Sequence, residues 1–361
     1  VVSSQYWDNG AVVNAGAVTL CYGGLGTCTG EMEEDNTITG QHPNDVYGLP
    51  SVYDPANEQL IVGRPAEDIV TLLRPPTSSI ADGAWSDDAI WDYGVPVPER
   101  DALLRGGTEV TLDVSTALRG VSIKPGAVFA LGAGTQITMT GDWRQEGSLV
   151  ANDATVIFAA PAGQELALAG PTTFFDLVVA PGATLFETSA SDHASVSGTL
   201  TNQGVIRKTK PVAATGITGF GLTGARLNVA SAGTLTALTV DRVAGAHPQE
   251  NVDDYGGITL DAHWDLTPIG AVGRAELCLT YTDAELATAP DVEESGLHLC
   301  RWSGTRWVCR PRSENSSAYS FSETESRIGT STRHGRRKSA TRRNDESPPW
   351  RAIRIASSSV P

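Results

Sequence analysis

The amino-acid sequence predicts an all-β protein built from several modules, and three observations support this. Hydrophobic residues make up 40% of the 361 residues, and 38 positions are Gly. Val, Thr, Ala and Leu dominate long stretches, a mixture that favours strands joined by glycine turns over helices. The length indicates two or three domains rather than one. Similar segments also recur along the chain, which is typical of stacked β units.

The net charge of −16 is unevenly distributed along the chain. Residues 301–361 hold 13 basic and 5 acidic side chains, a net charge of +8, so the first 300 residues carry −24. Such an acidic body repels phosphates and anionic membrane surfaces, which excludes nucleic acid and membrane as natural partners for residues 1–300. No window holds the roughly 18 consecutive apolar residues that a membrane helix requires. The chain starts with Val, and we expect an export signal to precede it.

Five cysteines are present, without a Cys-x-x-Cys pair or histidines at ligand spacing, so we expect no structural zinc site. Cys21 and Cys28 bracket a Gly-rich loop, which favours a local disulfide. Cys300 and Cys309 bracket a hairpin, and a four-residue loop at 303–306 would place them opposite each other. Cys278 is then left over. Free thiols in a reducing compartment are the alternative interpretation.

Residues 1–76 contain short apolar runs, each closed by Gly, Pro, Asn or Asp, which predicts short strands with tight turns. The stretch from Val2 to Thr19 is echoed by the stretch from Val62 to Thr71, with an offset of 60 residues between Val2 and Val62. A repeat of that size corresponds to four short strands, the content of a propeller blade.

This first segment resembles the FG-GAP-type blades of bacterial surface proteins, in which a small-residue strand precedes an Asp/Asn turn and a Gly-Ala-Val strand. The resemblance implies a propeller-like repeat fragment. Family blades often carry an Asp-x-Asp-x-Asp-Gly calcium loop, which this sequence lacks. The acidic residues within 31–35 are therefore interpreted as a solvated loop, with a calcium-stabilised module as the weaker alternative.

A shift in composition at Pro75–Ser79 marks the start of a second segment, residues 77–212. The run 120–129 returns as 176–185, an offset of 56 residues, and Gly147 corresponds to Gly204 with an offset of 57. Short alternating strands between glycine turns cannot close a core alone and must stack. The pattern predicts a parallel β-solenoid.

The second segment resembles the pectin-lyase-like β-helical stalks of secreted bacterial proteins, both in its opening run Trp85–Trp91 and in its Pro-Gly-Ala turns. β-Helices also host polysaccharide lyases and hydrolases, which use clustered carboxylates with Lys or Arg on one exposed face. The resemblance therefore implies a secreted spacer, with a carbohydrate-binding or polysaccharide-processing protein as the alternative function.

The polar residues of the solenoid do not follow the pattern of such a catalytic face. The acidic side chains are scattered over different predicted turns without a common period, and Lys124 is the only lysine within the two matched units; the acidic residues are Asp142, Glu146, Asp153 and Asp192. His193 beside Asp192 is interpreted as a lone pair on a polar loop. We predict no catalytic, cofactor-binding or metal-binding residue, and no enzyme activity.

Residues 213–309 show renewed alternation, which predicts a β-sandwich with one half-exposed face per strand. Thr282–Leu286 begins with an N-cap pattern and predicts one helical turn. The segment resembles the C-terminal immunoglobulin-like module of bacterial surface proteins, with its Trp-x-x-Thr-Pro strand, Tyr-Thr-Asp-Ala-Glu-Leu turn and Arg-Trp-x-Gly-x-x-Trp hairpin. Trp264, Trp302 and Trp307 are expected to pack in the core or across strands, and stacking on sugars is the alternative.

From residue 310 the alternation stops and Ser, Arg and Thr take over, which predicts a disordered basic tail over 310–361. The basic run 333–338 fits a nucleic-acid or localisation patch. Our preferred hypothesis is a change of reading frame near residues 311–326. Together the segments predict a structural or adhesive extracellular surface protein that needs no cofactor, with surface glycans or extracellular proteins as partners.

Overall fold

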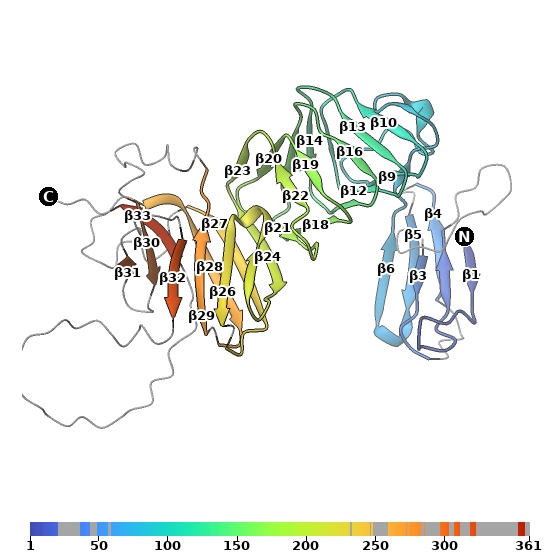
Figure 1. Cartoon of the computed structure of the whole chain (residues 1–361). Helices are drawn as coiled ribbons and strands as arrows, with labels where there is room; N and C mark the ends of the chain where they lie inside the picture. The colour runs from blue at the N-terminus through green and yellow to red at the C-terminus, as the bar shows by residue number, and fades with distance from the viewer. Residues whose placement is uncertain are drawn as a thin grey trace, which may run out of the picture.

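The computed structural model describes residues 1–20, 37–43, 49–56, 59–231, 233–245, 247, 259–271, 273–282 and 285, and the backbone of four later strands within 297–357. The protein is all-β, with 52% strand and 4% helix, and contains a parallel β-solenoid of about 6 turns, so the predicted fold class is confirmed. Figure 1 shows the solenoid between an N-terminal pair of sheets and a C-terminal β unit. In the part of the chain described here, no helix has the length and apolar character needed to span a membrane.

The N-terminal part consists of two antiparallel sheets of three strands. The first contains β1 (Val2–Ser4), β2 (Ala17–Thr19) and β3 (Thr37–Thr39), and the second contains β4 (Ser51–Asp54), β5 (Gln59–Arg64) and β6 (Ile69–Leu73). Val2 pairs with Thr19, and Val62 pairs with Thr71. Both stretches of the predicted repeat are therefore antiparallel strand pairs.

The two N-terminal sheets share one small core. Its members come from β2, β3 and β5 and from the segment before β4: Val18, Leu20, Ile38, Leu49, Leu60 and Val62. Each sheet hides one face against the other, which is how short strands with little apolar surface obtain a core. The propeller blade suggested by the FG-GAP resemblance stays a prediction.

The solenoid is a three-sided coil whose strands on each side stack in parallel. The first side contains β7 (Thr77–Ser78), β9 (Ala102–Leu104), β12 (Val121–Ile123), β15 (Trp143–Gln145), β18 (Gln164–Leu168), β21 (Thr184–Glu187) and β24 (Val205–Pro211). The second contains β8 (Gly83–Ala84), β10 (Glu109–Leu112), β13 (Val128–Leu131) and β16 (Ser148–Val150), followed by β19 (Thr172–Phe174) and β22 (Ala194–Val196). The third contains β11 (Thr116–Leu118), β14 (Gln136–Met139), β17 (Thr155–Phe158), β20 (Asp176–Val179) and β23 (Leu200–Asn202).

The period of the solenoid differs from the one predicted. Val121 pairs with Trp143, and Trp143 pairs with Leu166, so one coil takes 22 or 23 residues and not 56 or 57. The turn at Pro125 joins β12 to β13, whereas the turn at Pro181 joins β20 to β21, so the matched turns occupy different corners. All corners of the coil pose the same steric problem, and the same Pro-Gly-Ala turn solves it at more than one corner.

Aromatic side chains form a continuous stack inside the solenoid. Ring centroids lie 5.6 Å apart for Trp85 and Phe129, 6.3 Å for Phe129 and Trp143, and 5.4 Å for Trp143 and Phe174. Such pairs add about 0.5–1.5 kcal/mol each beyond the area that they bury. The alternation of buried and half-exposed residues along each strand directs these rings inward.

The C-terminal unit grows directly out of the solenoid. β24 pairs in parallel with β21 and antiparallel with β27 (Ala237–Ala244), which pairs with β28 (Thr259–Ile269). A second antiparallel sheet contains β25 (Gly216–Gly219), β26 (Ala225–Ser231) and β29 (Arg274–Leu279). A separate hydrophobic core includes Trp264, which is fully buried. The predicted core role of Trp264 is confirmed, and the immunoglobulin-like assignment stays a prediction. Three short 3-10 helices complete the fold: η1 (Pro65–Glu67), η2 (Asp88–Ile90) and η3 (Gly221–Thr223).

The backbone of the last four strands bears on two predictions. In β30 (Leu297–Trp302) and β31 (Trp307–Arg310), Cys300 pairs with Cys309 and Trp302 with Trp307, which confirms the predicted hairpin register. The predicted disorder of 310–361 is wrong for two segments, because β32 (Ala318–Ser322) pairs with β29, and β33 (Ile353–Ser357) pairs with β28 and β30. Both segments carry a short apolar alternation that the surrounding Ser and Arg residues obscure.

The disulfide predictions fall mostly outside the described residues. Cys21 and Cys28 lie there, as do the side chains of Cys300 and Cys309. Among the side chains that the structure describes, no disulfide occurs, and Cys278 is a half-buried free thiol. This agrees with its prediction as the unpaired cysteine.

Replacing Gly147 by Ala is expected to destabilise the solenoid. A Cβ atom there would lie 2.5 Å from the carbonyl oxygens of both Lys124 and Ala127, so the backbone of the neighbouring coil must move. The expected loss in the free energy of unfolding is about 1–3 kcal/mol. Gly170→Ala is the matched control, because no atom lies within 4 Å of its Cβ position. Equal chemical-denaturation midpoints for the two variants would contradict the close packing of coils.

Candidate functional site

The structure places the predicted polar residues of the solenoid at several corners. Asp142 precedes β15, Glu146 follows β15, and Asp153 precedes β17. Lys124 and Glu146 do come to one corner, because they follow Ile123 and Gln145, which are partners on adjacent coils. His193 donates its Nδ1 hydrogen to the carbonyl oxygen of Leu168 at 2.9 Å, a contact that ties neighbouring coils together. These positions form no shared carboxylate face.

Asp192 is the exception, because it belongs to a charged cluster at the C-terminal end of the solenoid. Lys208 Nζ lies 3.0 Å from Asp192 Oδ1, and Lys210 Nζ lies 3.1 Å from the same atom. Lys208 also donates a hydrogen bond to Glu187, and both side chains are fully buried. A further bond of 3.0 Å runs from Lys208 to the carbonyl oxygen of Ser191.

The alternation of β21 and β24 explains how these two charges come to lie inside the protein. Leu185 and Glu187 face inward on β21, and Ile206 and Lys208 face inward on β24. Glu187 continues the interior column of Val121, Trp143 and Leu166, as the strand registers show. The apolar column of the solenoid therefore ends in a buried ion pair. Each of its charges is compensated by the other and by further hydrogen bonds, as burial requires.

The helix η3 connects this ion pair to the C-terminal unit. The backbone N–H of Leu222 donates to Glu187 Oε2 at 3.0 Å, and its carbonyl oxygen accepts from Arg242 at 3.4 Å. The indole N–H of Trp264 donates to the carbonyl oxygen of Thr223 at 2.7 Å. The same short helix is thus held by β21 of the solenoid and by β27 and β28 of the C-terminal unit.

Arg242 completes the junction from the other side. It is almost fully buried, binds Glu285 through two hydrogen bonds of 3.2 and 2.5 Å, and lies over the Trp264 ring at 5.6 Å. Glu285 also accepts from the N–H of Thr282, whose hydroxyl accepts from the N–H of Glu285. This reciprocal capping box confirms the N-cap predicted at Thr282. We call Glu187, Lys208, Leu222, Arg242 and Glu285 the junction network.

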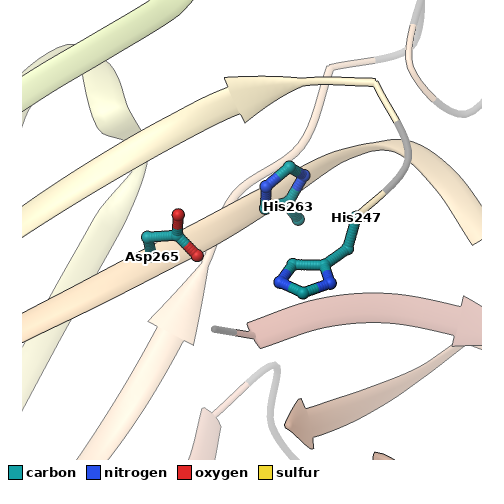
Figure 2. Close-up of side chains that lie close together, drawn as sticks. All are labelled: His247, His263 and Asp265. Atoms are coloured by element: carbon teal, nitrogen blue, oxygen red, sulfur yellow. The ribbon is translucent and has the colours of Figure 1, made fainter. Parts of the chain in front are cut away.

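A second polar cluster lies on β28 and was not predicted. His263 and Asp265 alternate on one face of the strand, and His247 follows β27. One ligand atom of each residue lies within 4.8 Å of the others, and Figure 2 shows the three side chains gathered together. The two imidazole rings meet edge to face, with centroids 4.9 Å apart. Burial raises the pKa of Asp265, which the charge of His263 partly opposes and that of Asp241 reinforces.

The two clusters differ in how far the sequence indicated them. The pattern His263-x-Asp265 puts both side chains on one strand face, and this is a usable signal. Nothing local indicated His247 as the third member, because it reaches the cluster only through the pairing of β27 with β28. Lys208 and Glu187 likewise carry no local sign of their partnership, since they belong to different coils.

Comparison with known proteins assigns only the N-terminal part of the chain. Residues 1–49 match a family model described as a repeat of unknown function, DUF5650. This match covers β1, β2 and β3 and ends before the solenoid. No curated protein and no solved structure matches the chain.

Replacing Lys208 by Met is expected to destabilise the protein by about 3–5 kcal/mol, because it leaves Glu187 buried without its counter-charge. Adding Glu187→Met should restore most of that stability, since the double variant removes both charges. Chemical denaturation of the single and double variants measures this. Lys210→Met is the control, with an expected cost below about 1 kcal/mol for a pair with a partly exposed partner. Additive losses in the double variant would contradict the pairing.

The acid stability of the protein should depend on Asp192. Burial alone would raise the pKa of Asp192, but hydrogen bonds from Lys208 and Lys210, together with their charges, outweigh burial and lower it below 3.8. A lowered folded-state pKa stabilises the fold above pH 3.8, and this contribution is lost as the pH falls through the folded value. Asp192→Asn should therefore flatten the decline in melting temperature below pH 4. An unchanged pH profile would show that Asp192 does not contribute to it.

Proposed function

We propose that this chain is a structural or adhesive part of an extracellular surface protein, in which the solenoid is a rigid spacer and the C-terminal unit presents a binding surface. One observation carries the proposal. A single sheet of 12 strands runs from β7 at the start of the solenoid to β31 in the C-terminal unit, and its pairing changes from parallel to antiparallel at β24. Hydrogen-bonded strands leave no linker at the boundary, as a rigid spacer requires.

The junction network supports the same function. Surface charges would let the two parts slide or separate at little cost, whereas breaking a buried ion pair costs several kcal/mol. The contacts of Glu187 and Arg242 with Leu222 hold both parts to one short helix. The acidic body and the resemblance to FG-GAP-type repeats, pectin-lyase-like stalks and immunoglobulin-like modules support an extracellular setting in bacteria.

Four described tryptophans argue for a scaffold over a sugar-binding groove along the solenoid. Trp85, Trp91, Trp143 and Trp264 are buried, so their rings pack inside the protein and offer no platform to a carbohydrate. An adhesive role then rests on the surface of the C-terminal unit or of the N-terminal sheets. Surface glycans or extracellular proteins are the proposed partners.

Antibodies against the folded chain, applied to cells that produce it naturally, test the proposed location. Intact cells should label as strongly as permeabilised cells, because the protein is proposed to lie outside. A cytoplasmic protein of the same cells provides the control and should label only after permeabilisation. Labelling of this protein only after permeabilisation would overturn the proposal.

A glycan array with product analysis tests the proposed absence of catalysis. The full chain is expected to bind either nothing or a defined glycan reversibly, and to release no shortened product. Release of oligosaccharides from a bound polysaccharide would identify a processing enzyme instead. Reversible saturable binding would specify the adhesive partner and leave the scaffold role intact.

A further inference from the structure

The cluster of His247, His263 and Asp265 has the composition and the surroundings of a metal site. The N–H of Gly245 donates to the carbonyl oxygen of Asp261 at 3.0 Å, so the end of β27 is held against β28. Gly245 itself has a φ of +87°, a left-handed conformation that turns the chain just before His247. His247 therefore returns to the strand that carries His263 and Asp265.

The hydrogen bonding of His263 leaves one nitrogen for coordination. Its Nδ1 lies 3.0 Å from the carbonyl oxygen of Gly245. A carbonyl oxygen only accepts, so Nδ1 carries the hydrogen and Nε2 keeps its lone pair. A backbone carbonyl that fixes the tautomer in this way is the usual outer partner of a metal-bound histidine. The buried ring is thus already held in the form that binds a cation.

Asp265 provides an independent observation that points to a ligand. Its Oδ1 atom is buried and has no hydrogen-bond partner, although a buried carboxylate oxygen without a partner is costly. The nearest positive side chain, Arg207, is engaged elsewhere: it donates two hydrogen bonds of 2.6 Å to Asp241, the cross-strand neighbour of Asp265. A cation beside His263 would compensate both Asp265 and the extra negative charge of Asp241.

The donor set selects the kind of cation. Two imidazole nitrogens and one carboxylate oxygen suit zinc and its neighbours in the first transition row, whereas Ca²⁺ and Mg²⁺ prefer sites made of oxygen atoms. Zn²⁺ at about 2.0–2.2 Å from each ligand needs ligand atoms about 3.4 Å apart. The present spacing of up to 4.8 Å closes to that value with a small movement of half-buried His247 toward β28.

We propose that His247, His263 and Asp265 bind one Zn²⁺ ion, with water at the fourth position, and that the ion fastens the connection after β27 to β28. The ligands lie 16 and 2 residues apart along the chain, which is why no short zinc motif marks them. The site stands apart from the junction network and is independent of the proposed surface role.

Isothermal titration of the full chain, freed of metal with EDTA, with ZnCl₂ tests this proposal. One equivalent should bind, addition of zinc should raise the melting temperature, and EDTA should reverse the change. Co²⁺ in place of zinc should give the visible absorption of a four-coordinate site with nitrogen and oxygen ligands. CaCl₂ should produce neither effect.

Two variants link the binding to this site. His247→Ala and Asp265→Asn should each weaken zinc binding by at least about 100-fold, beyond the loss typical of an outer partner. Asp265→Asn retains the shape of the side chain, so it tests the ligand even if His247→Ala misfolds. His42→Ala, which removes an exposed histidine far along the chain, is the matched control and should bind like the unmodified protein. Unchanged zinc affinity in either folded site variant, or no binding by the unmodified chain, would overturn the proposal.

Discussion

The buried ion pair between Lys208 and Glu187 is the constraint on which the two larger parts of the molecule depend. A parallel solenoid exposes its last apolar layer unless something covers it, and a bare end would be a site of fraying or aggregation. Here the interior column ends in a charged pair whose remaining hydrogen-bonding groups reach Ser191, Asp192 and η3. The end of the solenoid is therefore specified by polar contacts, and β24 passes directly into the C-terminal sheet.

The fold class followed from local pattern, because the physical cause of that pattern is local. Val121 and Ile123 alternate with Ser122, and the interior of a strand stack accepts only such alternation. The coil length was misjudged since a tight turn looks the same at every corner, so Pro125 and Pro181 matched although they join different sides. The strands β32 and β33 were missed because their pairing partners, β29 and β28, provide the stability that their own composition does not indicate.

The charged clusters were beyond the reach of sequence reasoning for a different reason. Lys208 and Glu187 are 21 residues apart, one coil of the solenoid, and their partnership exists only once the coil period is known. His263 and Asp265 carried a same-face signal, yet His247 joins them only through the pairing of β27 with β28. Burial of Trp264, by contrast, was predictable, since a large aromatic residue on an alternating strand faces the core in most sheets.

Native-state hydrogen exchange of the full chain tests most directly whether the solenoid and the C-terminal unit form one mechanical body. Amide groups of β21 and β24 in the solenoid, and of β27 in the C-terminal unit, should open with one shared free energy, because they belong to one sheet and one junction. Opening of β27 several kcal/mol below that of β21 would contradict the account. It would show that the boundary at β24 is a hinge and not a continuous connection.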